Sequence, residues 1–160
     1  MLSILFSKAA HVVGVLALAV AISLLKNCDS TPPEYEAFYA QSWESQRQEA
    51  KGFPLEKQID YYLAGRRYFH PPYHSLLPLI AERGKVAVSP LLEKMQQVDD
   101  DYARMDLLDV VLNIDEFHVD LSDDKPIIDE LTGIIARMKD VDRQTKAQAV
   151  LKEILENKRP

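Results

Sequence analysis

The chain begins with an apolar run that is longer than any in the rest of the sequence. Between Met1 and Leu25 only Lys8 carries a charge, and the seventeen residues from Ala9 to Leu25 carry none. Seventeen residues span about 25 Å as an α-helix, slightly less than the ~30 Å hydrocarbon core of a bilayer. This pattern predicts a membrane-directed segment over residues 1–28, ahead of a more polar remainder.

Three fates of this segment are compatible with the sequence. An uncleaved signal anchor is favoured, because the apolar character continues from Ala21 to Leu25 and cleavage after Ala21 would expose it to water. The small-x-small order Ala19-Val20-Ala21 also fits a signal-peptidase site, whose cleavage would release a periplasmic or secreted domain. Leu25-Lys26-Asn27-Cys28 resembles a bacterial lipoprotein box in its Leu and Cys, so Cys28 is the candidate for lipidation.

Beyond residue 28 the apolar positions recur with helical spacing, and no window alternates as a half-buried strand would. The pattern predicts an all-α protein: an N-terminal membrane helix followed by a short stack of about six or seven antiparallel helices, with no sheet. The first helix after the membrane segment is expected from Thr31 to Gly52, with Trp43 in its apolar stripe and Gly52 as a left-handed C-terminal residue. The others are expected at Pro54–Phe69, Leu76–Gly84, Val86–Met95, Asp99–Phe117, Pro126–Met138 and Asp142–Ile154.

The segment Ala87-Val88-Ser89-Pro90-Leu91-Leu92 carries a family resemblance. It is similar to the opening of the second helix in a HEAT-type hairpin, and it follows an apolar stretch that ends at Gly84. Residues 75–155 therefore resemble a short HEAT-like (ARM-type) repeat, and the arrangement is similar to that of small bacterial envelope proteins. The resemblance groups the helices into pairs. The first pair lies within Leu76–Met95, the second joins residues 105–114 with 126–138, and residues 146–155 form a helix without a mate. It implies a stack of helix pairs that offers its surface to partner proteins.

The chain divides into three regions: residues 1–28 as signal anchor or signal peptide, residues 29–74 as aromatic-rich N-terminal helices, and residues 75–160 as the HEAT-like region. Ten of the thirteen Phe, Tyr and Trp residues lie between Tyr35 and Tyr73. Tyr, Trp and Arg are enriched at interface hot spots, and the partner-binding candidates are Tyr61, Arg66, Arg67, Tyr68 and Phe69. The alternative is that these aromatic side chains pack the first helices against the repeat.

The charge balance restricts the classes of partner. The residues after position 28 carry 17 basic and 25 acidic side chains, a formal balance of −8. Nucleic acid is not expected, because binding to phosphates needs a clustered basic face, and anionic headgroups would be repelled as well. The expected partners are one or more proteins, together with the membrane through the N-terminal helix. A single cysteine allows no internal disulfide.

No catalytic motif is present, and the remaining polar clusters have simpler explanations. His70 and His74 are separated by Pro71-Pro72, which prevents the regular helical turn that would align two imidazoles on a metal. The acidic runs Asp99–Asp101 and Asp120–Asp124 lack the glycine of a calcium loop and precede helices, so they are expected to be helix caps. We therefore expect no enzyme, no catalytic residues, no cofactor and no metal.

The expected function is a non-catalytic, membrane-tethered helical-repeat protein that mediates protein–protein interaction in the bacterial cell envelope. Lys8 precedes the apolar run and acidic residues follow it, so the positive-inside rule favours a single-pass inner-membrane protein with a cytoplasmic N-terminus and a periplasmic domain. The alternative is an accessory subunit integrated into a larger membrane complex through its N-terminal helix. A secreted soluble enzyme, released by cleavage near Ala21, is the third hypothesis.

Overall fold

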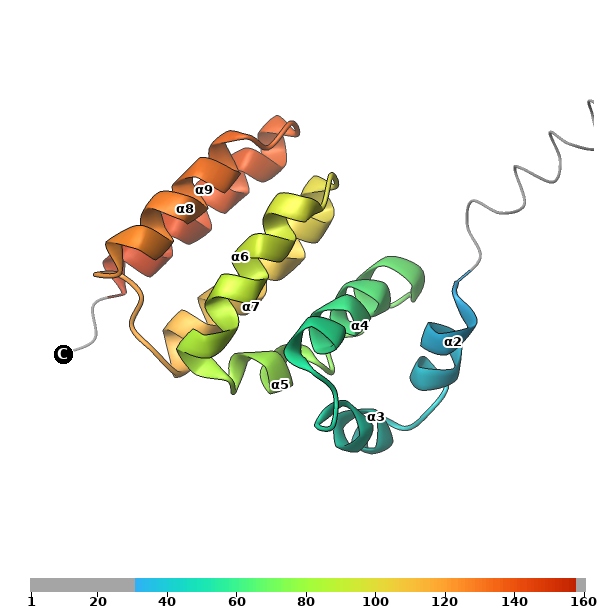
Figure 1. Ribbon diagram of the computed structural model, residues 1–160. Coiled ribbons are helices and arrows are strands. Elements are labelled where there is room, and N and C mark those ends of the chain that lie inside the picture. The colour runs from blue at the N-terminus through green and yellow to red at the C-terminus, as the bar shows by residue number, and fades with distance from the viewer. Residues whose placement is uncertain (1–30, 158–160) are drawn as a thin grey trace, which may run out of the picture. The chain divides into compact units, whose positions relative to one another are not determined.

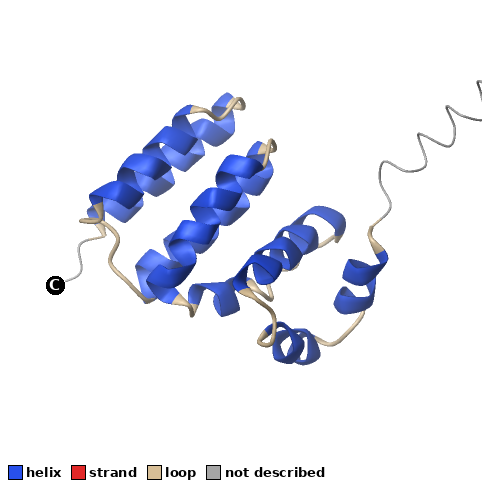
Figure 2. Cartoon of the chain, in the orientation of Figure 1, coloured by secondary structure: helices blue, strands red, loops and turns tan. Residues whose placement is uncertain are grey.

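The computed structural model describes residues 31–157 (Figure 1). Within that range the protein is all-helical, with eight α-helices, one short 3-10 helix and no strand (Figure 2). The expected all-α class is confirmed for this part of the chain. The expectations for residues 1–28, including cleavage near Ala21 and lipidation at Cys28, lie outside the described residues. None of the described helices is long and apolar enough to cross a membrane.

The helices follow one another with short connections. Their bounds are α2 (Pro33–Tyr39), α3 (Trp43–Ala50), α4 (Leu55–Tyr68), α5 (Leu77–Ala81), the 3-10 helix (Gly84–Ala87), α6 (Val88–Gln97), α7 (Asp101–Phe117), α8 (Lys125–Ala136) and α9 (Val141–Glu156). The described range thus holds more α-helices than the six or seven expected for the stack. The main reason is that one expected helix is divided in two.

The helix expected from Thr31 to Gly52 is interrupted between α2 and α3. The Ser42 hydroxyl caps α3 by accepting from Ser45 N at 3.3 Å, and the buried Gln46 amide donates to Gln41 O at 2.9 Å. These side chains offer the backbone an alternative to continued helix. Trp43 therefore begins a helix and is 55% exposed, so its expected place in an apolar stripe is wrong.

Two glycines differ in whether they end a helix in the left-handed conformation. Gly84 has φ +61°, which confirms it as the break between the two apolar runs, and it begins the 3-10 helix. It is the only residue with positive φ in the described range, so the same expectation for Gly52 is wrong. Lys51 ends α3 in a right-handed conformation, and its N–H bonds to Arg47 O.

From α4 onward the helices form two layers. α6 packs on α7 and α8 packs on α9, while α6 also contacts α8 and α7 contacts α9. α4 and α5 continue the same order, because α4 contacts α6 and α5 contacts α7. Figure 1 shows α6 in front of α7 and α8 in front of α9. One layer therefore holds α4, α6 and α8, and the other holds α5, α7 and α9.

The hairpins are α6–α7 and α8–α9, one helix later than the grouping expected from the sequence. α5 with α6 and α7 with α8 are not among the helix pairs that pack closely. The connections explain the difference. Three residues join α6 to α7 and four join α8 to α9. By contrast, six residues, which include the 3-10 helix, join α5 to α6, and seven join α7 to α8. Short connections favour antiparallel neighbours.

The apolar stripes of these helices meet in one core. Leu91 and Ile134, on α6 and α8, are 0% and 3% exposed. Leu108, Val111 and Ile154 are buried with them, which confirms the helical spacing used to predict them. Phe117 is an exception at 66% exposed, because it is the last residue of α7 and lies beyond the turn that Ile114 anchors in the core.

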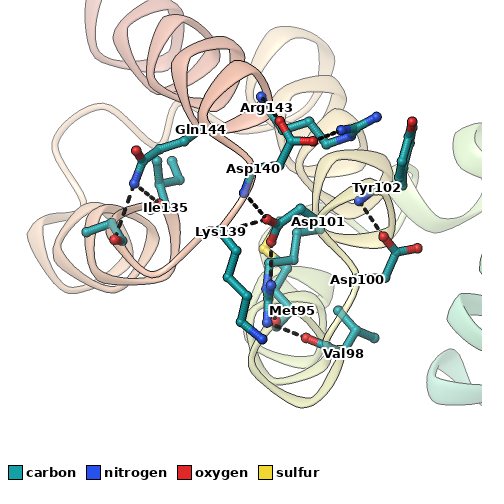
Figure 3. A network of polar contacts seen from close by, with 12 residues as sticks. Met95, Val98, Asp100, Asp101, Tyr102, Ile135, Lys139, Asp140, Arg143 and Gln144 are labelled. Carbon is teal, nitrogen blue, oxygen red and sulfur yellow. Dashed lines mark hydrogen bonds and ion pairs between the residues drawn. The ribbon is translucent and has the colours of Figure 1, made fainter.

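A polar network ties the α6–α7 turn to the α8–α9 turn (Figure 3). The buried Asp101 carboxylate accepts from Lys139 N at 2.7 Å and from Asp140 N at 2.8 Å, and it pairs with Arg104. Burial raises the pKa of Asp101, but the hydrogen bonds from Asp140, Arg104 and Lys139 outweigh it and hold that pKa below its ordinary value. Asp101 thus holds adjacent hairpins together.

The acidic runs also contain the expected helix caps. Asp100 accepts from Tyr102 N at 3.0 Å, at the start of α7, and Asp124 caps α8 through Ile127 N. This part of the expectation is confirmed for both runs. Asp101 goes beyond it, since its partners come from a connection 38 residues further along the chain.

Candidate functional site

Helix α4 carries four of the five candidate residues, and it turns Tyr61 inward. The Tyr61 ring is 9% exposed and lies 4.9 Å from the rings of both Tyr35 and Phe38 and 5.1 Å from that of Phe53. Its backbone carbonyl accepts from the Tyr39 hydroxyl at 2.5 Å. Tyr61 is therefore a core side chain that joins α2 to α4. For this residue the structure agrees with the alternative that the aromatic side chains pack the first helices.

Arg66 connects α4 to α7. Its Nε donates to Asp106 Oδ1 at 2.7 Å, and its side chain is 19% exposed. Its Nη1 also lies 2.5 Å from Nε2 of His74. Burial and the Arg66 charge lower the pKa of His74 below its ordinary value, so this imidazole is neutral at pH 7 and accepts from Arg66. Arg66 is consequently committed to partners within the domain.

Arg67, Tyr68 and Phe69 diverge at the end of α4. Arg67 is exposed, and its guanidinium lies 5.3 Å from the centroid of the Tyr68 ring. Tyr68 is half-buried and stacks on Tyr35, with centroids 6.3 Å apart and an interplanar angle of 22°. Phe69 turns toward Tyr39, at 4.6 Å between centroids. Arg67 and Tyr68 therefore remain accessible, and Phe69 contributes to packing.

Arg66, Arg67 and Tyr68 line one groove of about 740 Å³, which we call the α4–α7 groove. The structure brings to it residues that are distant in sequence, since its other walls come from α2 and from the turn between α6 and α7. Its aromatic and apolar lining includes Tyr35, Leu63, Tyr68, Val98, Tyr102 and Ala103. Three of the five sequence candidates are thus brought together, and Tyr61 and Phe69 do not line the groove.

Tyr102 is the most exposed aromatic side chain of the groove and was missed by the sequence analysis. It is 64% exposed on the first turn of α7. The guanidinium of Arg143, from α9, lies over its ring at 3.1 Å from the centroid. The available signal was its position, because Tyr102 falls outside the apolar stripe that begins at Met105. An aromatic residue off the stripe must face solvent or another element.

Two ion pairs cross the groove, and acidic side chains surround them. Lys94 on α6 lies 2.5 Å from Asp60 on α4, beside the Arg66–Asp106 pair. The pKa of the Tyr35 hydroxyl is raised, first by burial and then by the negative charges of Asp60 and Glu34. Burial disfavours the charged phenolate, and nearby carboxylates disfavour it further. Asp60 and Glu34 therefore add negative charge on the Tyr35 side of the groove.

The groove continues between α4 and α6 as a smaller hollow of about 220 Å³, which shares Asp60 and Lys94 with it. A separate groove of about 570 Å³ lies between the C-terminal ends of α7 and α9 and is lined by Phe117 and Lys152. Within residues 31–157 no three His, Cys, Asp or Glu side chains are grouped so that they could hold a metal ion.

What the α4–α7 groove offers is a contact surface built on rigid supports. Its aromatic rings are fixed by stacking on one another and on Arg67 and Arg143, and helix α4 is held to α6 and α7 by ion pairs. Preorganised aromatic side chains lose little conformational entropy on binding. A scan against protein-family models, a search of curated proteins and a search of solved structures each found no match to this chain.

Proposed function

We propose that the protein is a non-catalytic, HEAT-like adaptor of the bacterial cell envelope, held at the inner membrane by residues 1–28 and binding a protein partner with its periplasmic domain. The binding surface in this proposal is the α4–α7 groove. The membrane tether rests on the apolar run of the sequence, and the HEAT-like character is supported by the two layers of helices that α4 to α9 form.

A single observation carries the binding proposal: the groove combines accessible aromatic rings with a fixed framework. Tyr102 is 64% exposed, and it lines the same groove of about 740 Å³ as Arg67 and Tyr68. Tyr and Arg are the residue types that dominate binding energy at protein interfaces, and buried apolar contact supplies most of that energy. A solvated surface without binding function needs neither a hollow nor aromatic residues on its walls.

The test is partner recovery after cross-linking in cells that express the full chain. In the groove variant, Arg67→Glu is combined with Tyr102→Ala. The matched control combines Lys152→Glu with Phe117→Ala, which makes the same types of change in the separate groove between α7 and α9. We expect the groove variant to lose the cross-linked partner and the control variant to keep it, with both folded by circular dichroism. Equal recovery from both variants would contradict the proposal.

A third chain separates the adaptor from the accessory subunit. In this chain residues 1–28 are replaced by an unrelated single-pass anchor of equal length. An adaptor keeps its partner, because the groove makes the contacts. An accessory subunit that assembles through its N-terminal helix loses the partner, and this result would replace the proposed function by the alternative one.

A further inference from the structure

The charges that line the α4–α7 groove do not cancel. Lys94 is neutralised by Asp60 at 2.5 Å, and Arg66 is neutralised by Asp106 at 2.6 Å. These pairs use two of the three cationic side chains of Lys and Arg that line the groove. Arg67 is the one that has no ion pair within residues 31–157.

Four carboxylates remain along the groove and its continuation. Asp99 and Asp100 lie at the α6–α7 turn, and Glu56 and Glu93 line the hollow between α4 and α6. All four are exposed, and none of them forms an ion pair with a side chain in the described part of the chain. Against the single charge of Arg67, they leave the surface with an excess of three negative charges.

The aromatic rings in and beside the groove already receive cations from the chain itself. Arg143 lies 3.1 Å from the centroid of the Tyr102 ring, and Arg67 lies 5.3 Å from that of Tyr68. Nearby, Lys57 Nζ lies 3.8 Å from the centroid of the Phe53 ring. A cation over an aromatic face gains about 0.5–1 kcal/mol at an exposed site. The surface therefore combines aromatic rings, which already bind cationic side chains of the chain itself, with carboxylates that have no ion-pair partner.

We propose that the α4–α7 groove binds a segment of a partner protein that carries lysine and arginine side chains among apolar ones. This inference rests on the proposed function and specifies the chemistry of the partner. The carboxylates Glu56, Glu93, Asp99 and Asp100 attract the basic side chains, and the apolar ones cover Leu63 and Val98. A second copy of this chain is a poor occupant, because its residues after position 28 carry a formal charge of −8 and would repel the groove.

The test measures the affinity of three fluorescein-labelled synthetic peptides by fluorescence anisotropy. Each has sixteen residues of alternating composition: lysine with leucine, glutamate with leucine, or serine with leucine. The protein is the full-length chain in a non-ionic detergent, and sedimentation reports its oligomeric state. We expect the lysine peptide to bind at least about tenfold more tightly than the other two, since opposite charge across an interface both steers and selects partners.

Charge-reversal variants locate the binding. The groove variant carries Glu93→Lys and Asp99→Lys, and the control carries Glu116→Lys and Asp142→Lys, two exposed acidic residues at other places in the stack. The two variants have the same net charge. We expect the groove variant to weaken binding of the lysine peptide by about tenfold or more, and the control to change it by less than about twofold.

Three results would overturn the inference. The first is equal affinity for the glutamate or serine peptide, and the second is equal weakening by both charge-reversal variants, which would make the attraction a property of the whole acidic domain. The third is self-association of the chain without peptide binding, which would assign the groove to a second copy. If either of the first two occurs while cross-linking in cells still depends on Arg67 and Tyr102, the proposed function stands and only the basic character of the partner falls.

Discussion

Substitution of Gly65 by alanine is expected to destabilise the protein, although alanine is the better helix former. Gly65 lies inside α4, and the ring of Tyr39 packs directly against it. A Cβ at this position would lie 2.3 Å from the hydroxyl oxygen of Tyr39 and 2.6 Å from its Cζ. Tyr39 is 4% exposed, and its hydroxyl donates to Tyr61 O at 2.5 Å. The ring cannot move away without losing this bond or disturbing the neighbouring rings.

The magnitude follows from three opposing contributions. Overpacking a core costs about 1–3 kcal/mol, and a buried hydrogen bond that is broken costs about 1–3 kcal/mol. The higher helix propensity of alanine returns about 1 kcal/mol. We therefore expect Gly65→Ala to lower the free energy of unfolding by about 3 kcal/mol, which corresponds to roughly 10 °C in Tm for a domain of this size.

Gly133 provides the matched control, because it is also inside a helix but has room beside it. A Cβ there would meet only the Nη1 atom of Arg137, at 3.6 Å, which is an ordinary contact. Its substitution by alanine should raise the free energy of unfolding by up to about 1 kcal/mol.

Urea unfolding followed by circular dichroism measures both variants. A double variant combines Gly65→Ala with Tyr39→Leu and is compared with each single variant. Tyr39→Leu removes the ring that the new methyl group meets. We expect the two substitutions together to cost less than the sum of their separate effects, since the clash needs both side chains. The reasoning is refuted if Gly65→Ala is as stable as the parent chain, or if its effect adds fully to that of Tyr39→Leu.

Three further predictions address the network, the core and the first helices. Because the folded-state pKa of Asp101 is lowered, its stabilisation is present above about pH 4 and is lost as pH falls through the folded pKa. Asp101→Asn should cost about 3 kcal/mol at pH 7 in urea unfolding, and this cost should shrink progressively as pH falls below about 4. The same loss from Asp142→Asn would contradict this. Leu91→Asp should abolish the cooperative thermal transition, because the carboxylate would be buried without a partner. The control Val86→Asp, at a position that is 78% exposed, should leave the transition intact. Similar melting of the two variants would refute the assignment of Leu91 to the core. Trp43 is the only tryptophan, so iodide should readily quench the protein's tryptophan emission in the folded state. Emission that iodide does not quench would instead favour one uninterrupted helix from Thr31 to Gly52, with Trp43 in its apolar stripe.

Helical spacing was enough to predict the class of the fold, and local side-chain chemistry decided most of the differences. Leu91 and Ile134 are in the core because a period of 3.6 residues places every third or fourth residue on one face, whatever the partner helix is. The division at Ser42 depends instead on a single hydroxyl and on the Gln46 amide, which compete with the helix through bonds to the backbone. Such bonds leave no periodic signal in the sequence.

The sequence by itself determined the helical class, the apolar N-terminal run, the acidic balance and the aromatic-rich region, since all of these are sums or periods over neighbouring residues. Only the tertiary structure decided which helices pair, why Asp101 is buried, and that Tyr61 lies in the core while Tyr102 joins Arg67 and Tyr68 at one groove. The physical reason is the range of the interactions. Helix periodicity acts over four residues, whereas the pairing of α6 with α8 and the groove itself depend on contacts between residues more than thirty positions apart.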